Sequence, residues 1–305
     1  GDVYKRQINI LSDKHNMLKS NVIWPGHRRY KSCTEWEPIG FFSDCLCNAT
    51  YFDLMLGFFS SSAISVLANG FAVFLYNGGK MRLIVNDILT DDDKNAIAAG
   101  SGDIEILFFD IFDIQKIKDT LSERDRHFFD CLAWLIRHNR FEVKIIAPKS
   151  GIGISHTKSG IFSDGINKVG FDGSCNFSRT ALVDNIESLT VSCDWDGNIE
   201  VAKVEAIRKD FENVFQEKDC NVVYLSVDKV QTRITDSFPD KSISELLEAE
   251  YKILRNHRQH NISKHIIKAL DNSKERLEVI LDKLKEIEYR DIVIRSNEPQ
   301  FPYTS

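Results

Sequence analysis

The sequence predicts an α/β fold, because segments of strand length alternate with segments of helical pattern. Residues 51–86 give the clearest unit, in which the apolar run YFDLMLGFF and the strand-like KMRLIVN flank a helical segment. A strand–helix–strand unit with short connections favours two parallel neighbouring strands. Residues 199–216 carry apolar residues at helical spacing, so we expect a helix that packs on the sheet.

The composition allows a substantial core but no general affinity for nucleic acid. The chain has 305 residues, of which 43% are hydrophobic, and this suits one large domain with an appendage. Its formal net charge of -6 means that a contact with nucleic acid must come from a local basic patch. The most apolar run, residues 51–75, is interrupted by Asp53 and Asn69, so it predicts a strand and a helix rather than a membrane span.

The cysteines favour a reducing compartment and therefore a cytoplasmic protein. There are seven of them, an odd number, and they are widely scattered, which does not suit a disulfide scaffold. Cys33, Cys45 and Cys47 lie close together, but no second pair of Cys or His follows at the spacing of a zinc site. We therefore predict neither a metal nor another cofactor.

The remaining elements follow from apolar periodicity and from capping residues. Strands are expected at residues 51–59, 80–86, 104–109, 141–148 and 187–195. Helices are expected at residues 41–49, at 60–79 between the serines 60–62 and Gly78-Gly79, at 90–100, at 116–140 and at 199–216.

The chain divides into three predicted parts. Residues 1–40 form an N-terminal arm, residues 41–235 the main domain, and residues 236–305 a helical appendage that is highly charged and poor in glycine. Ser242 and Glu245 have the spacing of a capping box at the start of this appendage. Because the chain does not begin with Met and its ends look foreign to the rest, we expect a fragment of a longer protein.

The candidate site lies in residues 154–178, ISHTKSGIFSDGINKVGFDGSCNFS. Residues two apart on a strand share a face, so His156 and Lys158 are expected side by side at a strand's end. This pair suits a phosphate, because lysine supplies a point charge for non-bridging oxygens and imidazole is a nucleophile or acid near neutral pH.

The residues that follow predict a second strand and a polar turn beside this pair. Residues 167–173 have the pattern of the adjacent strand. After this strand, Ser174 and Asn176 can donate hydrogen bonds toward the same place, and Gly173 would let the backbone approach a bound anion closely.

Each of these elements taken singly is a weak signal. The chain has eight histidines, so an H-x-K triplet arises easily by chance, and Ser and Asn are ordinary turn residues. Their order is more specific, because H-x-K is followed by a strand, by G-S-x-N-F-S and then by Glu187 at the start of the next strand.

This ordered set resembles the signature of the phospholipase D superfamily. The matching residues are His156-Thr157-Lys158, Gly173-Ser174-Cys175-Asn176-Phe177-Ser178 and Glu187, with a spacing similar to the single-motif nuclease branch. Residues 58–86 also resemble the first lobe of such domains where they precede superfamily-2 helicases in bacterial restriction and phage-defence systems. The resemblance covers residues 41–217.

The resemblance implies both a fold and an assembly. The fold would be a phospholipase D-like mixed sheet flanked by helices on both faces, with the C-terminal helical appendage leading toward a helicase region. Residues 41–235 would be the nuclease domain, DNA its partner, and no membrane would be involved. The family uses a second His as general acid, yet no other histidine here is followed by Lys at two: His15, His27, His127, His138, His257, His260 and His265. A symmetric homodimer with its active site at the interface is therefore implied.

The resemblance also implies roles for the site residues. Neutral His156 would attack the phosphorus and form a phosphohistidine, Glu187 would orient its ring, and Lys158 with Asn176 would neutralise the equatorial oxygens. No metal would be needed. The residues expected to bind substrate are Ser174, Ser178 and Arg179.

One position departs from the family pattern H-x-K-x-x-x-x-D. The fifth residue after Lys158 is Ser163, and Asp164 stands one place further on. That Asp is often absent from the nuclease branch, so activity is not excluded, and Asp164 itself is not carried over as catalytic.

Three functions stay open at this point. The favoured one is a metal-independent endonuclease. The same chemistry could cleave a phospholipid or a small phosphodiester, although no membrane-facing apolar loop or basic amphipathic helix is found. The third is a catalytically weak module that dimerises or positions DNA for a helicase, and the displaced Asp164 and the acidic net charge favour it.

Overall fold

The computed structural model describes residues 17–56, 67–86, 121–149, 158–173, 188–227, 229–256 and 264–296. Within these ranges the strands form one mixed sheet in the order β1-β7-β6-β5-β2-β3-β4-β8. The strands are β1 Arg29–Lys31, β2 Tyr51–Leu56, β3 Lys80–Asn86, β4 Phe141–Pro148, β5 Lys158–Ser163, β6 Lys168–Gly173, β7 Ser188–Cys193 and β8 Val222–Leu225.

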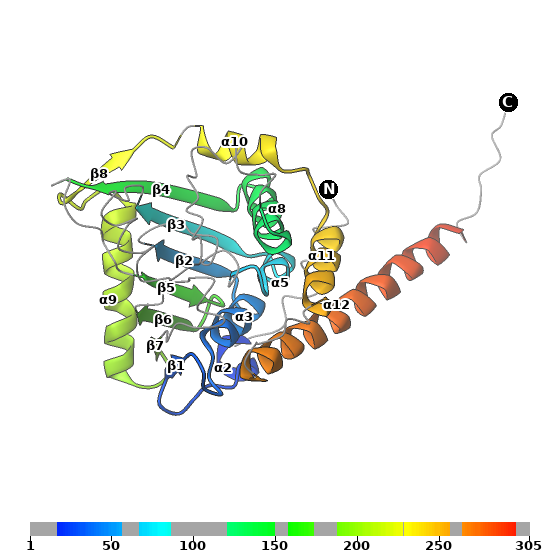
Figure 1. Cartoon of the computed structure of the whole chain (residues 1–305), viewed down its shortest axis with the longest axis horizontal. Helices are drawn as coiled ribbons and strands as arrows, with labels where there is room; N and C mark the ends of the chain where they lie inside the picture. The colour runs from blue at the N-terminus through cyan, green and yellow to red at the C-terminus, as the bar shows by residue number, and fades with distance from the viewer. Residues whose placement is uncertain are drawn as a thin grey trace, which may run out of the picture.

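The helices lie on both faces of this sheet. They are α2 Met17–Asn21, α3 Pro38–Asn48, α5 Phe71–Tyr76, α8 Glu123–Arg137, α9 Asn198–Phe215, α10 Val230–Ser237, α11 Ile243–Arg255 and α12 Lys264–Ser296. Figure 1 shows α9 on one side of the sheet and α3, α5 and α8 on the other, with α11 and α12 outside this second layer. The predicted α/β fold, with helices on both faces and C-terminal helices, is thus confirmed.

The sheet combines a parallel centre with antiparallel flanks. Strand β3 is parallel to both β2 and β4, and the first of these pairs is the one that the strand–helix–strand pattern of residues 51–86 predicted. All the other pairs are antiparallel, and β5, β6 and β7 form consecutive antiparallel neighbours beside β2.

Aromatic side chains fill the main core between the sheet and α3. The ring of Phe52 on β2 stacks on Phe162 of β5, with centroids 4.0 Å apart. Phe41 and Phe42 of α3 meet Phe171 of β6 edge-on. All five side chains are at most 1% exposed. Because burial of aromatic surface is a large favourable term, this cluster joins α3 to the antiparallel half of the sheet.

A smaller core and a charged group hold α9 on the opposite face. Arg82 of β3 donates to the carboxylate of Asp53 on β2 at 2.6 and 2.8 Å, and to Glu212 of α9 at 2.8 Å. Its guanidinium also lies over the rings of Phe211 and Phe215. These contacts raise the pKa of Arg82 and lower that of Glu212, because each charged form is stabilised by its partner.

Most predicted elements in the described ranges are confirmed, with one clear difference. One helix was expected over residues 60–79. Within this segment the structure describes residues 67–79, and α5 begins there only at Phe71. Gly70 precedes α5 with a left-handed φ of 92°, so the chain changes direction there. The strand expected at 104–109 and the helix expected at 90–100 lie outside the described residues.

The predicted arm at residues 1–40 contributes to the sheet in its described part. Strand β1 pairs with β7 in antiparallel register, and Tyr30 is buried against Phe41. Arg29 is exposed, Tyr30 is buried and Lys31 is exposed, which is the alternation of a strand with one buried face.

The C-terminal helices share the main core. The capping box of Ser242 and Glu245 is present at the start of α11, as predicted. Apolar side chains of α11 and α12 belong to the same core cluster as those of the sheet: Ile243, Leu246, Leu247, Leu254, Ile266, Leu270 and Leu277. The division of the chain at residue 236 therefore stays a prediction. None of the described helices has the length and apolar character needed to cross a lipid bilayer.

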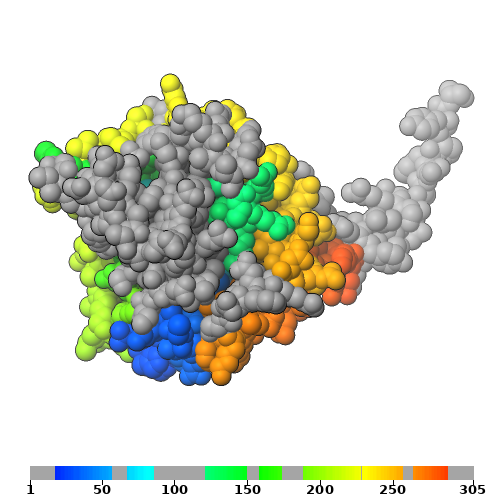
Figure 2. Space-filling view, viewed as in Figure 1, coloured from blue at the N-terminus to red at the C-terminus, as the bar shows by residue number. Residues whose placement is uncertain are grey.

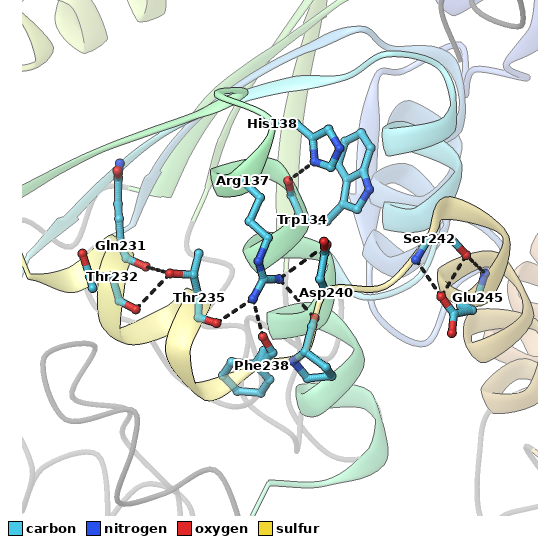
Figure 3. A network of polar contacts seen from close by, with 11 residues as sticks. Trp134, Arg137, His138, Gln231, Thr232, Thr235, Phe238, Asp240, Ser242 and Glu245 are labelled. Atoms are coloured by element: carbon cyan, nitrogen blue, oxygen red, sulfur yellow. Dashed lines mark hydrogen bonds and ion pairs between the residues drawn. The ribbon is translucent and has the colours of Figure 1, made fainter. Parts of the chain in front are cut away.

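Arg137 connects α8 to the end of α10 (Figure 3). Its guanidinium donates to the carbonyl oxygens of Thr235 and Phe238, both at 2.6 Å, and to that of Pro239 at 3.1 Å. The last carbonyls of a helix lack partners within the helix and carry partial negative charge. An arginine there donates hydrogen bonds to these oxygens and offsets their charge. This contact fixes the segment that leads into α11.

A buried carboxylate ties α11 to the other helices. Glu250 is 1% exposed and accepts hydrogen bonds from the backbone N–H groups of Gly70, at 2.6 Å, and Ala72, at 2.8 Å. Its second oxygen also lies 3.2 Å from Nε2 of His127 on α8. Glu250 thus satisfies the start of α5, where backbone N–H groups have no helical partner.

We expect Glu250→Gln to lower the free energy of unfolding by about 2 kcal/mol, because the amide nitrogen cannot accept from a backbone N–H. Urea denaturation measures this loss. Glu248→Gln, an exposed change on the same helix, is the matched control and should alter stability by less than about 0.5 kcal/mol. Equal losses in the two variants would contradict the role given to Glu250.

Candidate active site

The ends of three antiparallel strands define one edge of the sheet. Lys158, the first residue of β5, pairs with Gly173, the last residue of β6. Gly173 also pairs with Leu189, the second residue of β7. The start of β5, the end of β6 and the start of β7 therefore meet at the same edge.

The parallel strands end at this edge as well. Met55, next to the end of β2, pairs with Ser159 of β5. Leu56 pairs with Val85, and Asn86 at the end of β3 pairs with Ile146 of β4. In α/β sheets the carboxyl ends of parallel strands are the usual position of ligand sites. We call this side of the sheet, defined by Leu56, Asn86, Lys158, Gly173 and Ser188, the catalytic edge.

Of the predicted site residues, Lys158 is the one that falls within the described residues. The others, His156, Ser174, Asn176, Ser178, Arg179 and Glu187, lie outside them. Their described neighbours in sequence are informative: Lys158 follows His156 by two places, Gly173 directly precedes Ser174, and Ser188 directly follows Glu187. All three neighbours belong to the catalytic edge.

Lys158 is buried, with 4% of its surface exposed. On β5 it shares a face with Gly160 and Phe162, and Phe162 is part of the main core. Its partner across the strands is Gly173, which has no side chain. An ammonium group at such a position requires polar or anionic partners, because removing a charge from water without compensation is costly.

Gly173 has a packing role that the sequence did not indicate. A Cβ atom there would lie 2.6 Å from the carbonyl oxygen of Ser188 and 3.2 Å from Cα of Leu189. The expected role of Gly173, close approach to an anion, stays a prediction. What the structure requires of this glycine is the close approach of β7.

Asp164 lies at the other end of β5 from Lys158. Its carboxylate accepts from the backbone N–H groups of Ile166 and Asn167, at 2.9 and 2.7 Å, and so closes the turn between β5 and β6. It also accepts from the N–H of Leu18 at the start of α2, at 3.0 Å. These are structural contacts, and they account for an Asp at this position without catalysis.

Two of the described histidines, His127 and His138, have structural partners. His127 is 2% exposed and lies beside Glu250. His138 stacks on Trp134 at 3.8 Å between ring centroids, and its Nδ1 lies 2.8 Å from the Trp134 carbonyl oxygen (Figure 3). Both are engaged away from the catalytic edge.

The three cysteines that were considered as metal ligands differ in solvent exposure. Cys45 and Cys47 are in the core, and Cys33 is exposed. Burial raises the pKa of the Cys47 thiol to about 12, which disfavours the thiolate that binds metals. Within the described ranges, no three His, Cys, Asp or Glu side chains gather as metal ligands would.

Comparisons with known proteins assign no family to the chain. No protein-family model and no curated protein sequence matches the chain. Among solved structures, the polyphosphate kinase of Porphyromonas gingivalis matches with a TM-score of 0.34 and 11% identity, over 91% of this chain. The chain spans about a third of that protein's length, since 32% of it is covered.

One feature of this edge lies outside the motifs that the sequence singled out. Strand β1 pairs with β7, so that Lys31 stands opposite Ser188 and Arg29 opposite Thr190. The guanidinium of Arg29 donates to Oγ of Ser188 at 3.3 Å. A three-residue strand has too short a pattern to be found by periodicity.

We expect Gly173→Ala to destabilise the protein by about 1–3 kcal/mol, because the backbone of β7 cannot yield to the added methyl group as a flexible side chain could. Gly26→Ala is the control, since no atom lies within 4 Å of a Cβ built there and its φ is not left-handed. Thermal unfolding of both variants measures the difference. A Gly173→Ala protein as stable as Gly26→Ala would contradict this packing role.

Proposed function

We propose that this chain is a metal-independent phosphodiesterase of the phospholipase D superfamily that cleaves DNA as an endonuclease. The observation that carries the proposal is the convergence of Lys158, Gly173 and Ser188 at one edge of the sheet. Lys158 and Gly173 belong to the H-x-K and G-S-x-N elements of the motif, and Ser188 directly follows Glu187. Antiparallel pairing of β5, β6 and β7 thus supports a common site for residues that are far apart in sequence.

The proposed reaction has two steps. Neutral His156 attacks the phosphorus, and the new N–P bond forms as the P–O bond to the leaving group breaks. A second His156, from the partner chain and in its imidazolium form, gives its proton to the leaving oxygen. Water then attacks the phosphorus, the N–P bond breaks, and the second His156 takes the proton of the water.

The other site residues act through charge and position. Lys158 and Asn176 stabilise the negative charge on the equatorial oxygens, which is where positioned donors accelerate phosphoryl chemistry most. Glu187 orients the ring of His156 and stabilises its imidazolium form. Ser174, Ser178 and Arg179 bind the substrate. The burial of Lys158 supports its role, because an ammonium interacts with a phosphate more strongly away from water.

The proposal also places the protein in a helicase-associated defence system, as a homodimer in the cytoplasm. Neither His127 nor His138 can serve as the acid within its own chain, because both are engaged away from the catalytic edge. A polar site shared across a two-fold axis needs one histidine from each chain.

His156→Ala should abolish cleavage, lowering kcat by about three orders of magnitude or more, because the nucleophile is lost. Wild-type protein should cleave plasmid DNA in EDTA, since Lys158 and Asn176 take the role of a metal. Gel analysis of nicked and linear plasmid measures both. The matched control, His265→Ala on α12, should cleave normally.

Four results would count against the proposal. Loss of wild-type cleavage in EDTA would indicate a metal mechanism. DNA binding without cleavage would favour the alternative of a module that positions DNA, and hydrolysis confined to lipid vesicles would favour a lipid substrate. Loss of cooperative unfolding in His156→Ala would instead make the histidine structural.

Mixed dimers test the shared site. Wild-type and His156→Ala chains that carry different affinity tags are coexpressed, and the heterodimer is purified by two successive columns. It should have far less than half of the wild-type activity, because a single missing histidine removes either the nucleophile or the acid. Heterodimers that keep half of the activity would show that each chain works alone.

A further inference from the structure

A short basic segment at the catalytic edge has no role in the proposed chemistry. Residues 27–31 have the sequence His-Arg-Arg-Tyr-Lys, in a chain whose net charge is -6. Arg29 and Lys31 are exposed, and Tyr30 between them is buried. The two cations therefore share the outer face of β1, beside the start of β7.

The neighbouring Arg28 fixes this segment in place. Its guanidinium donates to both carboxylate oxygens of Asp196, at 2.5 and 2.8 Å, and to the carbonyl oxygen of Pro25 at 3.0 Å. Arg28 has a left-handed φ of 51°, a conformation that a long side chain adopts only when its surroundings impose it. The left-handed backbone of Arg28 costs conformational energy. The hydrogen bonds of Arg28 to Asp196 and Pro25 hold it, and with it the next residues in their register on β7.

Arg29 and Lys31 differ from Arg28, Arg82 and Arg276 in their partners. Arg28, Arg82 and Arg276 each bind a carboxylate. Among the described residues, no carboxylate lies within ion-pair distance of Arg29 or Lys31. On their face of the sheet, Arg29 is aligned through Thr190 of β7 with Asp172 of β6, which is two strands away and thus about 10 Å distant.

The position and spacing of the two cations fit a chain of phosphates. Residues two apart on a strand are separated by about 6.8 Å, which is similar to the separation of successive phosphates in an extended nucleic-acid strand. Lys31 stands opposite Ser188, the residue after Glu187. Figure 2 shows the described N-terminal residues, in blue, exposed on one face between α9 and α12.

We propose that Arg29 and Lys31 form a phosphate-binding strip that holds the nucleic-acid backbone beside the catalytic edge. The inference rests on the proposed nuclease function and adds a binding surface outside its motifs. The strip contacts phosphates two or more nucleotides from the scissile bond and reads no base. It supplies the local basic patch that an acidic protein needs to bind DNA.

The test measures binding separately from chemistry. The full chain carrying His156→Ala, which cannot cleave, is titrated in EDTA against a fluorescent DNA oligonucleotide, and anisotropy is recorded over a range of salt concentrations. Adding Arg29→Ala and Lys31→Ala should weaken binding about tenfold and reduce the slope of log K against log salt by about 2. Both side chains are exposed, so thermal unfolding should not change.

The matched control removes the same charges elsewhere. Arg255→Ala with Lys252→Ala changes two exposed cations on α11, which Figure 1 shows on the other side of α3, α5 and α8 from α9. This variant should bind DNA as the parent does. In proteins with His156 intact, hydrolysis of a small aryl phosphodiester should be unaffected by Arg29→Ala with Lys31→Ala, since such a substrate does not reach the strip.

The outcomes separate the strip from the nuclease. Equal affinity and salt slope in the two double variants would overturn the strip, and so would a parent protein that binds no DNA. A protein that binds DNA through the strip but cleaves none would keep this inference and end the nuclease proposal. If both cations are removed and DNA affinity and cleavage are unchanged, the strip is overturned and the nuclease proposal is kept.

Discussion

The antiparallel register of β5, β6 and β7 determines which segments of the chain meet at the catalytic edge. A shift of one residue in a strand turns every side chain to the opposite face. Such a shift in β5 would move Lys158 to the α9 face and expose Phe162. Gly160 opposes it, because a Cβ at that position would lie 2.5 Å from the carbonyl oxygen of Asp53 on β2. Gly173 opposes a corresponding shift of β6 against β7, because a Cβ there would lie 2.6 Å from the carbonyl oxygen of Ser188.

The aromatic core supports the same register from one side. The stack of Phe52 on Phe162 and the edge contacts of Phe171 with α3 require these rings on one face of three neighbouring strands. Burial of the rings therefore stabilises the arrangement that brings Lys158 and Gly173 together. Packing and proposed function depend on the same strand pairing, so a change in the core would also disturb the edge.

Much of this fold could be predicted because long elements carry repeated patterns. Strand β4 and helix α9 have enough residues for period 2 or 3.6 to be evident. Strand β1 has three residues, and its partner β7 is more than 150 residues away in sequence, so no local pattern identifies it. The contact of Glu250 with Gly70 is equally remote, and a buried glutamate in a charged helix looks like any solvent-facing one.

The order of the site residues along the chain could be predicted, but their arrangement in space could not. The motif identifies residue types, and β6 and β7 were found at the predicted places, whereas β5 begins at Lys158, where the expected strand was to end. The convergence of His156, Asn176 and Glu187 stays a prediction, because these residues lie outside the described ranges. Asp164 illustrates the limit of a motif alone, since contacts with Leu18 and with its own turn, which no spacing reveals, give it a structural role.

The C-terminal helices are mechanically joined to the layer that covers the sheet. Asp44 of α3 forms an ion pair with Arg276 of α12, and the hydroxyl groups of Ser43 and Ser273 are 2.5 Å apart. Glu250 of α11 satisfies the start of α5, which directly precedes β3 in the chain. A displacement of α11 would leave backbone N–H groups of α5 buried without partners, which is costly. The helices after residue 236 therefore contribute to the stability of the sheet, through the helical layer of α3, α5 and α8 that they contact.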